Sequence, residues 1–179
     1  MTKTTIPAGI WNIDPSHSTV GFVARHLVIS KVRGSFRSFS GAITIGEQQL
    51  ESSVTASIDM ASVDTSDEGR DGHIKGEDFF DVAKFPTMTF TSTKVTQDGD
   101  DFEVIGDLTI KGVTRSVVLD LEFNGTSQDP WGGTRAGFSA ETEINRKDFG
   151  LEWNVVMETG GVLVGEKIKI ELDIQAVQA

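Results

Sequence analysis

The sequence predicts a mainly β protein, an eight-stranded antiparallel β-barrel with one or two short helices. Apolar and polar residues alternate with a period of two along most of the 179-residue chain, as in strands with one wet face. The connections between these segments are mostly short and contain tight-turn residues. A series of sequential hairpins with a single wet face buries its apolar face by rolling up on itself.

The N-terminal half supplies the first predicted strands. The segment "STVGFVARH" places its apolar side chains on one face around Phe22. The segment 32–45 is long and less regular, and its Gly34 and Gly41 predict bends or bulges. Strict alternation returns in the segment 54–60.

The C-terminal half alternates more regularly. Lys111-Gly112 predicts one tight hairpin, and the Asp98-Gly99 pair predicts another. The remaining predicted strands lie, in order, around residues 88–90, 102–110, 117–123, 138–144 and 166–176.

Two segments break the alternation and predict short helices. Residues 25–34 have apolar side chains at helical spacing. A second helix is predicted after Ser66, which is a suitable N-cap, with Asp67 and Glu68 favourable in its first turn. Pro86 lacks an N–H group and is expected to end this helix.

Length and composition limit the function classes. A chain of 179 residues predicts a single domain over 1–179. The net charge of −11 argues against binding to nucleic acid, whose phosphates such a surface repels. No apolar run resembles a signal peptide or a membrane span, so we expect a cytoplasmic protein without stable membrane insertion. The absence of Cys excludes disulfides and thiolate metal sites.

The three histidines are the first candidates for chemistry. His17, His26 and His73 are enough imidazoles for an open zinc site. However, no HExxH or His-x-His spacing is present, so we expect no metal. A role in hydrogen bonding, either structural or to a ligand head group, is favoured.

Other catalytic patterns are weaker. Ser16 and Ser18 flank His17, but neighbours along a strand point to opposite faces. No GxSxG motif is present. The aspartates around Asp100 have the spacing of calcium or acid–base groups, yet they sit at a predicted hairpin tip, where a solvated turn is favoured. None of these patterns is a strong catalytic motif.

The aromatic content bears on the barrel interior. The chain has eleven Phe and three Trp but no Tyr, a set that suits an apolar interior. An eight-stranded barrel has room either for side chains alone or for one small ligand. The residues alone leave both a filled core and a ligand-binding lumen open.

Four segments resemble the YceI-like family, in the order and spacing of that family, from about Trp11 to the C-terminal strand. They are "WNIDPSHSTVGFVARHLVISKVRGSF", "RDGHIKGEDFFDVAKFPTMTF", "GDLTIKGVTRSVVLDL" and "RKDFGL". The resemblance implies a lipocalin-like barrel whose lumen binds a polyisoprenoid, an isoprenoid quinone or a fatty-acid derivative. It implies no cofactor other than the bound lipid, no enzymatic activity, a carrier or sequestering role, and a homodimer.

Candidate ligand-binding residues follow from strand parity and from this resemblance. The predicted lumen residues are Val20, Phe22, Phe36, Phe79, Phe80, Phe90, Leu121, Phe138 and Trp153. The predicted head-group residues are His17, His26, Arg70, His73 and Arg146, with Arg25 and Arg33 as further cations for a phosphate. Two alternatives stay open, namely an enzyme that uses these His, Asp and Arg residues on a hydrophobic substrate and an interaction module with a filled core.

Overall fold

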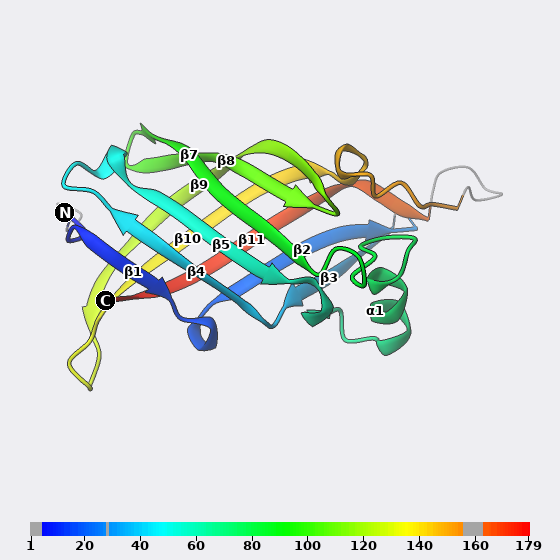
Figure 1. Cartoon of the computed structure of the whole chain (residues 1–179), viewed down its shortest axis with the longest axis horizontal. Coiled ribbons are helices and arrows are strands. Elements are labelled where there is room, and N and C mark those ends of the chain that lie inside the picture. The colour runs from blue at the N-terminus through cyan, green and yellow to red at the C-terminus, as the bar shows by residue number, and fades with distance from the viewer. Residues whose placement is uncertain (1–4, 28, 156–162) are drawn as a thin grey trace.

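The computed structural model describes residues 5–27, 29–155 and 163–179, whose strands form one antiparallel sheet (Figure 1). In chain order the strands are β1 (Gly9–Ile13), β2 (Thr19–His26), β3 (Ser30–Phe36), β4 (Phe39–Ile45), β5 (Ser53–Asp59), β6 (Val63–Asp64), β7 (Thr87–Asp98), β8 (Asp101–Ile110), β9 (Val113–Gln128), β10 (Thr134–Asn145) and β11 (Val164–Gln178). The described residues contain one α-helix, α1 (Glu68–Lys75), and four 3₁₀ turns at Pro15–His17, Gln49–Glu51, Met60–Ser62 and Arg146–Phe149.

Eight strands close into the barrel that the sequence predicts. Their order is β1, β4, β5, β7, β8, β9, β10 and β11, and β1 pairs back to β11. The strands β2 and β3 extend this wall toward one end, because the first part of β11 pairs with β2 and its last residues pair with β1. The predicted barrel, its antiparallel pairing and its short helical content are confirmed.

The barrel end near α1 is incompletely closed by strands. On its outer edge β3 pairs with β6 through Ser35 and Phe36 only, because β6 has two residues. The segment after β6 turns into α1 and a loop that returns at β7. Figure 1 shows this helix at one end of the barrel, while both chain termini lie at the other end.

Both predicted hairpin turns are present. Lys111 and Gly112 have φ angles of 51° and 74° and join β8 to β9 as a two-residue turn. Asp98 pairs with Asp101 across the second turn, where Gly99 has a φ of 61°. Positive φ at the turn matches the twist of the flanking strands, which explains the glycine in each.

The helix predicted over 25–34 is wrong. These residues finish β2 and begin β3, and His26 pairs with Ser30 across the hairpin. Leu27 takes a φ of 56° at the turn; Val28 lies outside the described residues. Backbone pairing between two adjacent strands outweighs the apolar spacing that favoured a helix.

The helix predicted after Ser66 exists, but its ends differ from the prediction. Asp67, not Ser66, is the N-cap, and its carboxylate accepts a hydrogen bond of 2.9 Å from the amide of Arg70. The helix ends at Lys75, well before Pro86. Gly76 terminates it, with its N–H bonded to the carbonyl of His73 at 3.1 Å.

The segment 32–45 is two strands, and it breaks between Phe36 and Phe39 and not at a glycine. At Gly34 a Cβ would lie 2.3 Å from the ring of Phe22, and at Gly41 it would lie 2.7 Å from the carbonyl of Thr55. These glycines therefore allow close approach within continuous strands, and the predicted bends at them are wrong.

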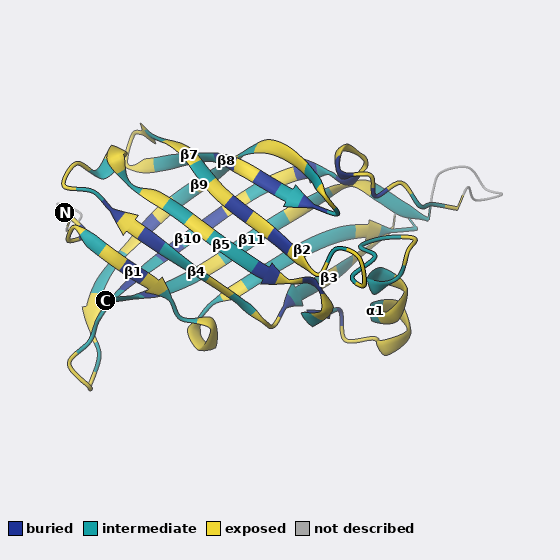
Figure 2. Cartoon of the chain, viewed as in Figure 1, coloured by how far each residue is buried: buried dark blue, intermediate teal, exposed yellow. Residues whose placement is uncertain are grey.

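The apolar interior has two buried clusters. One gathers near the α1 end around Phe36, Phe90 and Phe149, and the other gathers near the termini around Trp11 and Phe138. Figure 2 shows buried positions alternating with exposed ones along the strands, as the period-two pattern predicts. The space between the first cluster and α1 is a cavity.

Candidate ligand-binding site

The main cavity lies at the α1 end of the barrel and has a volume of about 560 Å³. Its walls come from β2, β3, β7, β8, β10 and β11, and its mouth is formed by α1 together with Phe79, Phe80, Leu151 and Trp153 from the following loops. Small-molecule sites have volumes of roughly 300–1,000 Å³, so this cavity is of ligand-binding size.

Six of the nine predicted lumen residues line this cavity. They are Val20, Phe22, Phe36, Phe79, Phe80 and Trp153. Within the cavity the rings of Phe22 and Phe36 lie 5.6 Å apart, and the ring of Phe80 lies 6.1 Å from that of Phe36. These three rings come from β2, β3 and the loop after α1, so the loop is packed onto the strands by apolar contact.

The other three predicted lumen residues lie outside this cavity. Phe90 is buried in the first cluster, deeper in the barrel. Leu121 and Phe138 line a separate cavity of about 70 Å³ toward the termini. The alternation of side chains along each strand correctly predicted that all three face the barrel interior. It does not predict their position along the barrel axis, which depends on the register between strands.

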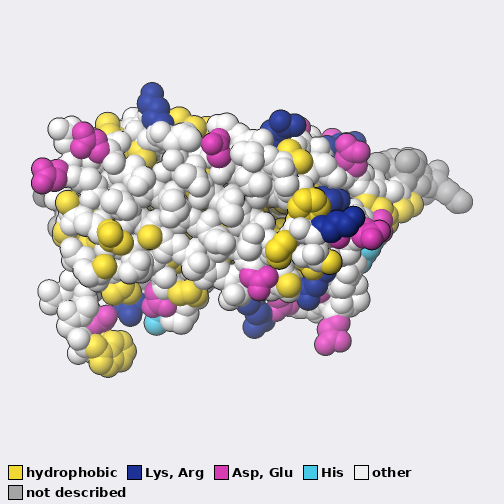
Figure 3. All heavy atoms as spheres, in the orientation of Figure 1, with side chains coloured by type: hydrophobic (Ala, Val, Ile, Leu, Met, Phe, Trp, Pro, Cys, Tyr) yellow, Lys and Arg dark blue, Asp and Glu magenta, His cyan; other side chains and the backbone are white. Residues whose placement is uncertain are grey.

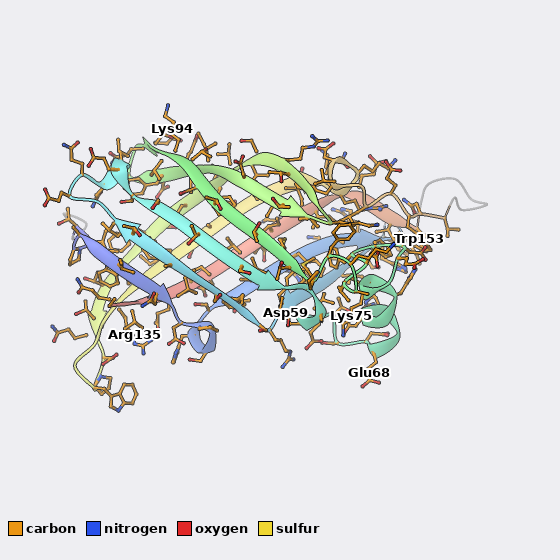
Figure 4. The ribbon with its side chains drawn as sticks, in the orientation of Figure 1. Asp59, Glu68, Lys75, Lys94, Arg135 and Trp153 are labelled. Carbon is orange, nitrogen blue, oxygen red and sulfur yellow. The ribbon has the colours of Figure 1, made fainter. Side chains whose placement is uncertain are left out.

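An aromatic cluster covers the mouth. The ring of His73 contacts Trp153 and Phe79 edge-on, with centroid distances of 4.6 Å and 5.1 Å. Phe79 and Trp153 lie 5.3 Å apart and complete the triangle. His73 Nε2 also lies 2.9 Å from a carboxylate oxygen of Asp78. Figure 4 shows Trp153 at the α1 end of the barrel.

Arg146 is a buried guanidinium that organises this end. Its side chain is 2% exposed, and its guanidinium donates four hydrogen bonds to backbone carbonyls. The acceptors are the carbonyls of Leu151 (2.6 Å), Trp153 (2.9 Å), Gly165 (2.9 Å) and Val164 (3.2 Å). Burial lowers the pKa of Arg146, which the Glu166 charge partly opposes. Arg146 therefore ties the segment holding Trp153 to the start of β11.

Two further arginines line the cavity at its edge. Arg70 donates to the side-chain oxygen of Thr65 at 2.8 Å and to the Thr65 carbonyl at 2.7 Å. Arg25 lines the same mouth. Within the described residues, no carboxylate forms an ion pair with Arg25, Arg70 or Arg146, although Asp67 lines the same cavity. Figure 3 shows apolar and charged side chains gathered at the α1 end.

The histidines do not come together. His26 and His73 line the cavity, but His17 lies on the 3₁₀ turn between β1 and β2. Its Nδ1 contacts both Ser16 (3.0 Å) and Asp14 (2.9 Å). A catalytic triad needs one ring nitrogen for the serine and the other for the aspartate, so this exposed group lacks that geometry.

Asp14 also connects His17 to the end of the barrel away from the cavity. Arg135 bridges Asp14 and Asp129 at 2.7 Å and 3.0 Å, and Figure 4 shows Arg135 far from Trp153. The predicted head-group cation Arg33 likewise lies outside the cavity, with its guanidinium 3.6 Å from Glu171. The described residues contain no cluster of His, Asp and Glu suited to a metal ion.

Several lining residues were not predicted. They are mainly aliphatic and include Ile74, Met88, Ile110, Ile144, Leu151 and Ile168. Most follow from the strand alternation already read in the sequence. Leu151 is different, because it follows a 3₁₀ turn and enters the cavity wall only through the turn that Arg146 holds.

Comparison with known proteins identifies the family. The YceI-like domain model matches residues 11–176. The chain is 44% identical to Protein YceI of Escherichia coli O17:K52:H18 over 137 residues. These matched residues make up 76% of this chain and 72% of that protein. This chain belongs to the YceI-like family.

Solved structures agree with this YceI-like fold. The YCEI protein of Campylobacter jejuni superposes with a TM-score of 0.74 at 32% identity, over 100% of this chain and 99% of that one. A polyisoprenoid binding domain from Saccharophagus degradans gives a TM-score of 0.72 at 18% identity, over 97% and 100% of the two chains. The second likeness is evidence of fold alone. No helix in the described part of the YceI-like chain is long and apolar enough to cross a membrane.

Proposed function

We propose that this YceI-like protein binds one long-chain apolar lipid, such as a polyisoprenoid, an isoprenoid quinone or a fatty-acid derivative, without catalysing a reaction on it. The observation that carries the proposal is the 560 Å³ cavity, whose wall is mostly aliphatic and aromatic, with its charged and imidazole side chains at the α1 end. Support also comes from the structurally similar polyisoprenoid binding domain. A filled core, one of the alternatives raised by the sequence, does not fit a cavity of this size.

The cavity wall provides the main driving force. Each methylene group that leaves water gains about 0.8 kcal/mol, so a chain with many buried methylenes binds tightly without specific polar contacts. Such lipids are nearly insoluble, which suits a carrier or sequestering role. The apolar part of the wall includes Phe36 and Ile144, which belong to the buried cluster inside the barrel, so the lipid tail would point into the barrel.

The head group would remain at the mouth. Arg25, Arg70, Arg146, His26 and His73 line the cavity, together with the carboxylate residue Asp67. Among the described residues the Arg146 guanidinium has four carbonyl acceptors for its five N–H groups. Within the described residues these arginines form no ion pair with a carboxylate, which suits an acidic or carbonyl-bearing head group. His17 is no longer a candidate, because it is bonded to Asp14 away from the cavity.

The enzyme alternative is less well supported. It needs acid–base groups that converge on a substrate, yet His17 is distant and the Asp78 carboxylate contacts His73 at the outer side of the mouth, where both side chains are substantially exposed. Transport of the ligand, a homodimer and a cytoplasmic location stay predictions.

Mass spectrometry of organic extracts from the purified protein tests the proposal. We expect a co-purified lipid, and reloading of the stripped protein with a linear isoprenol or a fatty acid. Ala24→Trp places a large side chain in the cavity and should abolish loading, whereas Ala83→Trp, in the exposed loop after α1, should not. A folded protein that is always empty and loads no lipid would refute the proposal.

A further inference from the structure

A second, smaller cavity inside the described part of the barrel has no place in the function proposed above. It measures about 70 Å³ and lies toward the termini, lined by side chains that include Ile43, Val54, Val95, Phe102, Val104 and Phe138. Its wall is also apolar. The side chains that separate it from the main cavity determine how far a lipid tail can extend into the barrel.

Phe90 lies between the two cavities along the strand that carries it. On β7, Met88 lines the main cavity and Val95 lines the far one, with Phe90 between them. On the neighbouring strand β8, Ile110 lines the main cavity and Val104 lines the far one. Phe90 belongs to neither lining and is 7% exposed.

Two of the positions around the Phe90 ring, Ala56 and Gly106, are small. Phe90 pairs with Ala56 on β5 and with Leu108 on β8. The ring lies over Gly106, where a Cβ would be 2.4 Å from its Cζ atom. Glycine and alanine at these positions make room for one large ring. Neither can fill the space if the ring is removed.

We infer that Phe90 is the stop that ends the lipid-binding lumen and sets the longest tail the protein accepts. This inference rests on the proposed function and adds a specificity-determining residue to it. A tail entering past the mouth meets the Phe90 ring after the main cavity is filled. Without the ring, Leu108 and the small positions Ala56 and Gly106 would remain between the two cavities, and the lumen would extend into the space that the ring now fills.

Chain-length dependence of binding tests the inference. Stripped wild-type protein is titrated with straight-chain fatty acids from decanoic to docosanoic acid, and dissociation constants are measured by calorimetry. Affinity should rise about fourfold for each added methylene, the equivalent of about 0.8 kcal/mol, until the tail reaches Phe90, and then stop rising. Phe90→Ala should move this limit to longer acids by several methylenes.

Phe138→Ala is the matched control. It removes a buried ring of the same size from the far cavity and leaves Phe90 in place, so its limit should equal that of the wild type. Thermal unfolding of each variant is measured in parallel, because loss of a buried ring destabilises the barrel. If Phe90→Ala does not fold, Phe90→Leu should still shift the limit by at least one methylene.

The two ideas fail separately. An unchanged limit in a folded Phe90 variant, with normal binding of short acids, overturns the role of Phe90 and leaves lipid binding intact. Absence of binding for every acid in every protein, together with an empty lipid extract, overturns both.

Discussion

The imidazole of His73 lies perpendicular to the indole of Trp153, with an interplanar angle of 89° and a centroid distance of 4.6 Å. His73 belongs to α1, and Trp153 belongs to the segment between β10 and β11. Two parts of the chain that are far apart in sequence therefore meet over the cavity mouth. Their contact covers the cavity through aromatic packing and without strand pairing.

Removing the indole should speed release of a bound lipid. Aromatic pairs contribute about 0.5–1.5 kcal/mol, so Trp153→Ala should raise the dissociation rate by roughly 2- to 10-fold. Stopped-flow transfer of a fluorescent fatty acid to acceptor vesicles measures this rate. Trp131→Ala is the control, because Trp131 is 84% exposed at the β9–β10 turn. Equal rates in both variants would mean that the aromatic cluster is only a structural cover.

Arg146→Lys should destabilise the fold almost as much as Arg146→Ala. A lysine ammonium cannot reproduce the planar fork that reaches four carbonyls. Of the freed acceptors, the Leu151 carbonyl is buried and the other three are partly buried. We expect a loss of about 3–5 kcal/mol in the free energy of unfolding, measured by urea denaturation, because several charge-assisted hydrogen bonds are lost together. Arg115→Ala serves as the comparison, since exposed Arg115 makes one hydrogen bond to the Asp148 carbonyl and should cost under about 1 kcal/mol. Similar losses at the two arginines would contradict this account.

The same glycine-to-alanine change should have opposite effects at two sites. At Gly34 the new methyl would collide with the Phe22 ring, which lines the cavity, and should cost about 1–3 kcal/mol of stability and weaken lipid binding. At Gly72, inside α1, no atom lies within 4 Å of the new methyl. There the change should stabilise by about 0.4–1 kcal/mol. Thermal denaturation and lipid titration of the two variants decide the matter, and a stabilised Gly34→Ala would show that Phe22 moves freely.

The alternation of apolar and polar residues predicted most strands of the barrel from the sequence. Inward positions such as Val104, Leu108 and Phe138 are buried as predicted, because a strand side chain has only two faces to choose between. The turns at Gly99 and Gly112 were equally readable, since positive φ leaves few residue choices. Short-range rules suffice where the constraint is local.

Position along the barrel was not readable from local rules. Phe90 and Phe22 both face the barrel interior, yet Phe90 is packed in the buried cluster and Phe22 lines the cavity. Their difference depends on register across several strands and on Gly106 and Gly34 beneath their rings. Arg146 was predicted as a head-group residue for its charge alone. Its four carbonyl partners come from segments whose approach no local pattern encodes.

Acid should weaken the protein partly through Asp14. Hydrogen bonds from Ser16, Arg135 and His17 hold the pKa of this carboxyl well below its ordinary value. The unfolded chain therefore binds a proton at a higher pH than the native state does. The stabilisation is complete above the ordinary pKa of about 3.9 and is lost as the pH falls below it.

Asp14→Asn should remove this part of the acid dependence. We expect it to lower the free energy of unfolding near neutral pH by about 1–3 kcal/mol, because the charge-assisted bond to Arg135 is lost, and to change it little in strong acid. Urea denaturation across a series of acidic buffers measures both effects. Glu143→Gln is the control, since its ion pair with Lys167 spans 3.7 Å between side chains that are more than half exposed and contributes little. If Asp14→Asn keeps the wild-type slope between neutral and acidic pH, the acid sensitivity arises at other carboxylates.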